Sequence, residues 1–98
     1  MALIVSPQVE TELDEIWLYI ASESSSIEIA DRVIDSITER FLELARNPYL
    51  GRKREDLRPG LGSVTAGSYV VIYRVDVDDV KVLHVLHGRR DIVAILRQ

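Results

Sequence analysis

The most apolar part of the chain lies between residues 68 and 91, where two runs of β-branched and aromatic residues flank Asp76-Val77-Asp78-Asp79. Such runs are typical of strands, and the acidic segment supplies turn residues, so the pattern predicts an antiparallel hairpin. Side chains alternate between the two faces of a strand, and here apolar residues occur on both faces. We therefore expect central strands, with one face covered by the rest of the chain and the other by a partner.

The beginning of the chain changes from a strand pattern to a helical one. Residues 2–5 are apolar and stop at Ser6 and Pro7, which predicts a short strand followed by a helix with Ser6 at its N-cap. Apolar residues then recur every three or four positions, which predicts an amphipathic helix to about Ser22. Trp17 lies on the apolar side of this helix, so we expect it in the core.

A serine-rich linker at residues 22–26 predicts a reversal of the chain. Ser25 and Glu28 have the spacing of a capping box, so a second helix is expected to open there. Its apolar residues form a continuous seam, and Asn47-Pro48 ends it, because the residue before a proline disfavours the α conformation. The two helices are therefore expected to form an antiparallel hairpin that lies on the sheet.

Glycine and proline mark the remaining connections. Residues 49–62 predict a loop, residues 63–66 a short strand that turns at Gly67, and residues 92–96 either a helical turn or an arm against the sheet. The element order βααβββ with a short C-terminal tail predicts an α+β fold, in which the helical hairpin packs on a mostly antiparallel sheet. A length of 98 residues fits one domain over residues 1–98.

Acidic and basic residues are separated along the chain. Residues 1–45 carry ten acidic and two basic side chains, residues 46–98 carry six acidic and ten basic ones, and the net charge is −4. The separation predicts an acidic helical side and a basic side that suits an acidic partner, although surface charges also fall this way by chance. The chain has no cysteine, no signal-peptide pattern and no membrane-spanning apolar run, so we expect a cytoplasmic protein.

Two basic clusters are candidate binding sites. Four cations lie within the loop at residues 49–62, which is either a solvated connection or a contact for an anion or an acidic peptide. The second cluster is the charged corner at residues 88–91, directly after the last strand. Metal-free RNA cleavage needs an acid and a base as well as cations, and an acidic chain is a poor non-specific RNA binder. The cations alone therefore do not make a catalytic site.

A metal site is not expected from this sequence. His84 and His87 lie three residues apart on a predicted strand, which directs them to opposite faces. No glycine-rich phosphate loop and no nucleophile motif is visible. We therefore expect neither a metal nor a cofactor.

Three segments occur together in this chain: Asn47-Pro48 with Gly51-Arg52, residues 69–73 (YVVIY), and residues 87–91 (HGRRD). Each is weak alone, but together they make the chain resemble the ParE/RelE superfamily of bacterial toxins from type II toxin-antitoxin modules, over essentially the whole length. The nearest branch is similar to ParE. The resemblance implies a toxin of α+β fold that a cognate antitoxin neutralises.

The superfamily includes RelE-like enzymes that cut messenger RNA on the ribosome and ParE-like proteins that are understood to block DNA gyrase. RelE-like enzymes have an arginine directly after the tyrosine that begins the central strand, where this chain has Val70. They also have an aromatic residue or histidine near the position of Leu96, and residues 92–98 contain none. The resemblance thus implies a non-catalytic gyrase inhibitor. The alternatives are a RelE-like mRNA endonuclease and a non-toxic member that only binds the antitoxin.

The same resemblance implies a ParD-like or other antitoxin whose disordered acidic segment folds onto the toxin, which then contacts DNA only indirectly through that antitoxin. No cofactor is implied. The predicted partner contacts are the charged residues of the two clusters: Arg52, Lys53, Arg54, Arg58, Arg89, Arg90 and Asp91.

Overall fold

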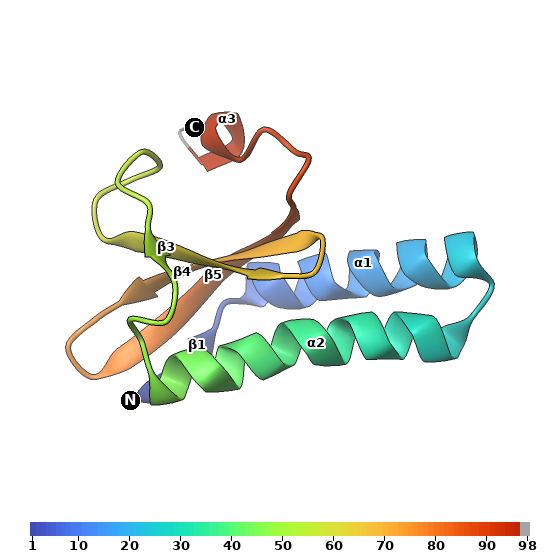
Figure 1. The fold of residues 1–98 in the computed structure, drawn as a ribbon, viewed down its shortest axis with the longest axis horizontal. Coiled ribbons are helices and arrows are strands. Elements are labelled where there is room, and N and C mark those ends of the chain that lie inside the picture. Colours follow the sequence, from blue (N-terminus) through green and yellow to red (C-terminus); the bar gives the residue numbers. More distant parts are fainter. Residues whose placement is uncertain (97–98) are drawn as a thin grey trace.

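The computed structural model describes residues 1–96, which form a five-stranded sheet between two unequal helical layers. Helices α1 and α2 lie side by side across one face of the sheet and extend past its end, whereas α3 lies over the other face (Figure 1). The predicted α+β fold is confirmed, and the last residues of the predicted tail, Arg97 and Gln98, lie outside the described residues. The elements are β1 (Ala2–Val5), α1 (Pro7–Ser24), α2 (Ile27–Arg46), β2 (Arg52–Lys53), β3 (Leu61–Ala66), β4 (Tyr69–Val75), β5 (Asp79–His87) and α3 (Ile92–Leu96).

The strand order is β1-β5-β4-β3-β2, in which β1 runs parallel to β5 and the other neighbouring strands are antiparallel. The predicted hairpin is confirmed as β4 and β5, and its turn is closed by a hydrogen bond of 2.8 Å from the Asp76 amide to the Asp79 carbonyl. A bulge shifts the register of this pair after Ile72. Because of the shift, Val82 and Val85 lie in the same core although they are three residues apart.

The segment predicted only as a loop, residues 49–62, contains the edge strand β2. Two glycines make room there for the ring of Tyr73: a Cβ on Gly62 would lie 2.7 Å from Tyr73 Cζ, and one on Gly51 would lie 2.5 Å from the Tyr73 hydroxyl. Tyr73 is buried, and burial raises the pKa of its phenol. A two-residue strand has no periodicity to detect, so the pattern of the sequence missed β2.

Helix α1 begins at Pro7 as predicted and ends at Ser24, two residues later than expected. Ser6 occupies the N-cap position, but its hydroxyl donates a hydrogen bond of 3.2 Å to the Leu83 carbonyl of β5. The prediction of Ser6 as the N-cap residue is confirmed, although its side chain makes no capping hydrogen bond. Ser6 instead joins the start of the helix to the sheet.

The turn between the helices also differs in detail from the prediction. Ser25 takes the left-handed conformation that reverses the chain, with a φ of 54°, so the cap of α2 is Ser26, whose hydroxyl accepts a hydrogen bond of 3.1 Å from the Ile29 amide. Trp17 is only half-buried, and its indole nitrogen donates a hydrogen bond of 2.8 Å to Asp31 on α2. The expectation of a core tryptophan is corrected to one that joins the two helices.

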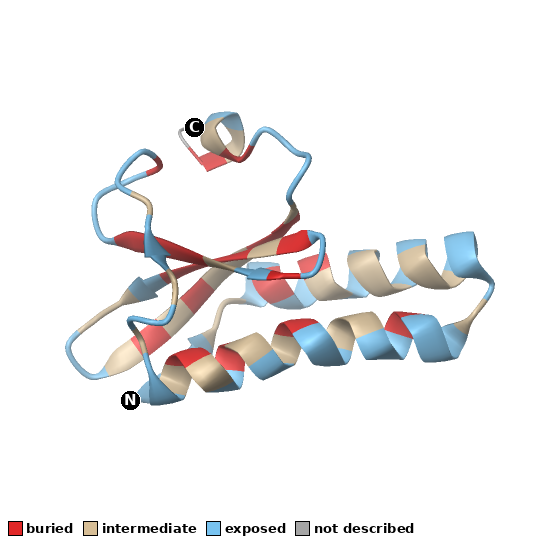
Figure 2. Cartoon of the chain, in the orientation of Figure 1, coloured by how far each residue is buried: buried red, intermediate tan, exposed pale blue. Residues whose placement is uncertain are grey.

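Buried residues occur in the strands, along α1 and α2, and in α3 (Figure 2). Their side chains form two clusters on opposite faces of the sheet. The expectation that a partner covers the second face is wrong, because α3 and the segment from Leu57 to Leu61 cover it. The helix-side core consists of Val9, Ile37, Phe41, Leu44, Ala66, Tyr69, Val71, Tyr73, Val80, Val82 and Val85. The second-face core consists of Leu57, Leu61, Ile72, Leu86, Ile92 and Leu96.

Candidate partner-binding site

The seven predicted contact residues fall into two separate groups. Four of them lie on or just after β2, and three follow β5. Strands β3 and β4 lie between β2 and β5. At the usual spacing of neighbouring strands, the distance from β2 to β5 is about 14 Å. The fold thus places the two basic clusters on different parts of the molecule and does not combine them in one pocket.

Arg54 is held inside the molecule. Its Nε and Nη2 atoms donate to the two carboxylate oxygens of Asp56 at 3.0 and 2.9 Å, and Nη1 donates to the Ser63 hydroxyl at 3.4 Å. This hydrogen bonding raises the pKa of Arg54 and lowers the pKa of Asp56. The Arg54 side chain is only 14% exposed. Its contacts hold the loop in place and leave little of the side chain accessible to solvent.

Arg58 and Asp91 hold the two ends of α3. The Nε and Nη2 atoms of Arg58 donate to the Leu96 carbonyl oxygen at 2.9 and 2.7 Å, at the C-terminal end of the helix. The Asp91 carboxylate accepts a hydrogen bond of 3.1 Å from the Ala94 amide, at the N-terminal end. Both side chains have an intramolecular role.

The other four residues, Arg52, Lys53, Arg89 and Arg90, are exposed. None of them forms an ion pair with another residue of the described chain, residues 1–96. They are the cations of the two clusters that remain available to a carboxylate of a partner. Partner contact by the seven residues stays a prediction.

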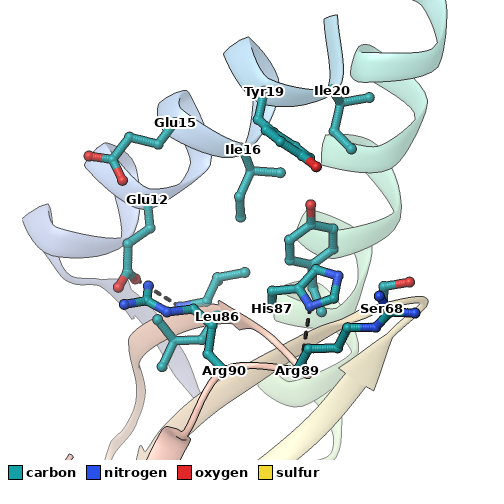
Figure 3. A pocket seen from close by; sticks show the side chains of 12 residues that line it. Glu12, Glu15, Ile16, Tyr19, Ile20, Ser68, Leu86, His87, Arg89 and Arg90 are labelled. Atoms are coloured by element: carbon teal, nitrogen blue, oxygen red, sulfur yellow. Dashed lines mark hydrogen bonds between the residues drawn. The ribbon is translucent and has the colours of Figure 1, made fainter. Parts of the chain in front are cut away.

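A cleft of about 610 Å³ separates α1 from the end of the β4–β5 hairpin (Figure 3). One wall comes from α1, and the opposite wall comes from the last residues of β5 and the basic corner. The walls of the cleft combine apolar, aromatic and charged side chains. They include Glu15, Ile16, Tyr19, Tyr69, Arg89 and Arg90.

Glu12 fixes the position of α1 against the sheet. Strand β1 pairs with β5 only as far as Val82, and the remaining edge of β5 meets α1 instead. There the Glu12 carboxylate accepts a hydrogen bond of 2.8 Å from the Val85 amide and lies 3.0 Å from His84 Nδ1. Glu12 is buried, with 8% of its surface exposed. The carboxylate thus takes the place of a further strand residue and joins α1 to the edge of β5 beside the cleft.

Aromatic side chains form the inner end of the cleft. The His87 ring packs edge-on against Tyr69, with ring centroids 5.3 Å apart, and its Nδ1 accepts a hydrogen bond of 3.1 Å from the Arg89 amide. Burial raises the pKa of the Tyr69 phenol, and the nearby phenol of Tyr19 raises it further. Tyr19 itself is 61% exposed. An aromatic surface therefore leads from the protein interior to solvent, next to the basic corner.

The two histidines have different neighbours: His84 contacts Glu12, whereas His87 contacts Tyr69. Among residues 1–96, no group of three or more histidine and acidic side chains is placed to hold a metal ion. Within the same residues, no helix is both long enough and apolar enough to cross a membrane.

Sequence reasoning identified Arg89 and Arg90 but missed the α1 wall of the cleft. Tyr19 and Glu12 lie about seventy positions earlier in the chain, and only the packing of α1 on β5 brings them to the basic corner. One signal was present: Glu12 lies between Val9 and Ile16 on the apolar side of its helix. A carboxylate in that position indicates a buried hydrogen-bond donor nearby.

Comparisons with known proteins identify the family. Residues 3–92 match the family described as the ParE toxin of the type II toxin-antitoxin system parDE. The chain is 34% identical over 86 residues to toxin ParE3 of Caulobacter vibrioides, and the aligned region covers 88% of this chain and 85% of that protein. It is 30% identical over 90 residues to toxin ParE1 of Mycobacterium tuberculosis, and this aligned region covers 91% of each of the two proteins. A solved structure described as the chromosomal ParDE TA system from P. aeruginosa has the same fold, with a TM-score of 0.78 at 20% identity over 89% of this chain and 95% of that one. The chain therefore belongs to the ParE toxin family of type II toxin-antitoxin systems.

Proposed function

We propose that this toxin acts by binding and inhibiting DNA gyrase, that it catalyses no reaction, and that a ParD-type antitoxin neutralises it. The observation that carries the proposal is the ParE family match over residues 3–92. The similarity to a solved ParDE system supports a ParD-like partner. Because gyrase works on the bacterial chromosome, the proposed place of action is the cytoplasm.

Two positions support a binding function over RNA cleavage. The RelE resemblance would require an arginine after Tyr69, and Val70 at that position packs against the second-face core. It would also require an aromatic residue or histidine near Leu96, which is an aliphatic residue buried in the same core. These positions offer neither a group to hold a phosphate nor one to transfer a proton. Inhibition by protein contact needs neither group.

The antitoxin is proposed to approach with a disordered acidic segment that becomes ordered on the toxin. Its carboxylates would meet the four exposed cations Arg52, Lys53, Arg89 and Arg90. Of the seven predicted residues, Arg54, Arg58 and Asp91 would contribute by keeping the β2 loop and α3 in place. In this arrangement DNA is bound by the antitoxin and only indirectly by the toxin.

Induced expression in a bacterial host tests the proposal. Expression without the antitoxin is expected to stop growth, relax a reporter plasmid and induce the DNA-damage response, and co-expression of the antitoxin is expected to reverse all three. Mapping of mRNA ends in the same cultures separates the alternatives. Codon-dependent cuts on translating ribosomes, abolished by Arg89→Ala or Arg90→Ala, would establish a RelE-like ribonuclease. Normal growth with antitoxin binding intact would establish a non-toxic family member.

A further inference from the structure

We propose that the toxin contacts gyrase through the outer face of the α1–α2 hairpin, and that this face docks on a positively charged surface of the enzyme. The outer face is the side of the two helices that points away from the sheet. Its exposed residues include Glu10, Asp14, Leu18, Asp35, Glu39 and Leu42. The inference rests on the proposed inhibition of gyrase, and it adds the place and the chemistry of the contact.

The position of this face follows from the residues that the helices bury. Helix α1 packs Val9 in the helix-side core, and with 3.6 residues per turn Asp14 and Leu18 lie on the opposite side of the helix. The same spacing places Asp35 and Glu39 on the side of α2 that faces away from the sheet. The two helices lie side by side, so their outer sides form one continuous surface (Figure 1).

The carboxylates of the outer face have no basic partner within the chain. Among residues 1–96, no ion pair includes one of the four carboxylates Glu10, Asp14, Asp35 and Glu39. In each helix the two carboxylates are four positions apart, which places like charges next to each other and destabilises the helix. Arg32 lies on the same side of α2 and offsets only part of this charge. A partner that brings positive charges would relieve the repulsion.

Exposed leucines add an apolar contact to the acidic surface. Leu18 is 60% exposed and follows Asp14 by one helical turn, and Leu42 is 55% exposed and follows Glu39 by three positions. Apolar side chains surrounded by polar ones are the usual arrangement of a protein interface. The carboxylates can attract a basic partner from a distance, and the leucines gain free energy when contact removes them from water.

The charge of the face selects its partner. Gyrase holds DNA, and proteins that hold DNA present positively charged surfaces to the phosphates. Such a surface complements the acidic hairpin, whereas DNA itself is repelled by it. The hairpin extends past the end of the sheet, so the rest of the chain leaves it accessible to a large enzyme (Figure 1). Because the cleft beside Arg89 and Arg90 also uses α1, an antitoxin bound there would lie next to the gyrase contact.

The test measures inhibition of supercoiling by the full-length chain and its affinity for purified gyrase. Asp14→Asn/Asp35→Asn is expected to weaken both about tenfold, because two carboxylates lose their attraction to the partner. The matched control is Glu55→Gln/Asp78→Asn, which removes the same charge from exposed positions outside the hairpin. It should change both quantities by less than about twofold, because distant surface charges are screened by salt.

A second pair of variants tests the apolar part of the contact. Leu18→Ala should weaken gyrase binding about fivefold, whereas Val77→Ala, at a position that is 93% exposed in the β4–β5 turn, should leave it unchanged. Added salt should weaken binding of the unchanged chain more than binding of Asp14→Asn/Asp35→Asn. Chemical denaturation should find this double variant at least as stable as the unchanged chain, because it removes a repulsion. A lower stability would contradict the repulsion.

The outcomes separate this contact from the proposed function. Full supercoiling in the presence of the unchanged chain overturns the inhibition of gyrase itself. Inhibition that the outer-face variants leave intact keeps the proposed function but overturns this contact surface. Equal losses of gyrase binding and antitoxin binding also overturn it, because the face would then belong to the antitoxin. Self-association of the free chain that Asp14→Asn/Asp35→Asn abolishes has the same consequence, because the basic corner of a second copy would be the occupant.

Discussion

The two faces of the sheet are covered in different ways. On one face, two helices of 18 and 20 residues bury a continuous apolar seam. On the other face, a helix of five residues and a short loop segment cover a smaller cluster, and side chains hold them at their ends through directional hydrogen bonds. The first face is stabilised by buried area, whereas the second depends on a few polar contacts. The comparison predicts that the two faces respond differently to the same type of substitution.

The largest expected effect is on the helix-side core. Ile37→Ala removes a side chain that is fully buried between α2 and the sheet, and it should lower the free energy of unfolding by about 4 kcal/mol. Ile92→Ala in α3 should cost only about 2 kcal/mol, because a short helix can readjust to fill the space. Chemical denaturation of both variants measures the difference. Equal costs would contradict the distinction between the faces.

The next effect concerns the edge strand β2. In Gly62→Ala the added methyl group would lie 2.7 Å from the Tyr73 ring, and because the ring is buried it has little room to move. We expect a loss of about 2 kcal/mol from overpacking. Gly60→Ala is not a suitable control because Gly60 has a positive φ of 82°. Thr65→Ala on β3 is suitable, since its side chain is exposed, and it should cost less than about 1 kcal/mol.

A smaller effect is expected from the polar contact that holds α3. Arg58→Met removes both hydrogen bonds to the Leu96 carbonyl. It should lower the free energy of local opening of α3 by about 1 kcal/mol. Amide exchange within α3 would then be about fivefold faster, while exchange in α2 stays the same. Arg52→Met is the matched control, because Arg52 is exposed and lies on β2. Exchange that increases equally in both variants would show that α3 does not depend on Arg58.

The smallest expected effect is a dependence of the free energy of unfolding on acidic pH. The hydrogen bond from Arg54 lowers the pKa of Asp56 in the folded state below its ordinary value of 3.8. The ion pair is therefore fully stabilising above pH 3.8 and is lost as the pH falls through the lower pKa of the folded state. Denaturation at pH 7 and at pH 2.5 should show a larger acid-induced loss for the unchanged chain than for Asp56→Asn. Glu55→Gln, at the neighbouring exposed position, should behave like the unchanged chain.

The features that the sequence predicted are those in which many residues repeat one pattern. The two helices and the β4–β5 hairpin were expected at nearly the observed positions, because their apolar residues recur over ten residues or more. The features it missed depend on single contacts. Residues 92–96 were expected as a helical turn or an arm against the sheet, and the turn is confirmed as α3, but the contacts of Arg58 and Asp91 that hold it leave no periodic signal. Strand β2, which forms around one tyrosine ring, leaves none either.

In the candidate site, too, features visible in the sequence occur beside features that depend on contacts between distant residues. The basic corner was visible because Arg89 and Arg90 are adjacent in the sequence. Its opposite wall was not, because Tyr19 reaches the corner only through the packing of α1 on the end of β5. Arg54, Arg58 and Asp91 resembled surface charges in the sequence, and only the structure reveals their intramolecular partners.

Titration of DNA gyrase with the purified chain tests the central claim most directly, with the ATP-dependent supercoiling of plasmid DNA as the readout. We predict that supercoiling falls in proportion to the ratio of chain to gyrase, reaches a plateau when gyrase is saturated, and recovers when the antitoxin is added. Full supercoiling at a large excess of chain, together with cleavage of many translated transcripts per chain, would contradict inhibition by protein binding.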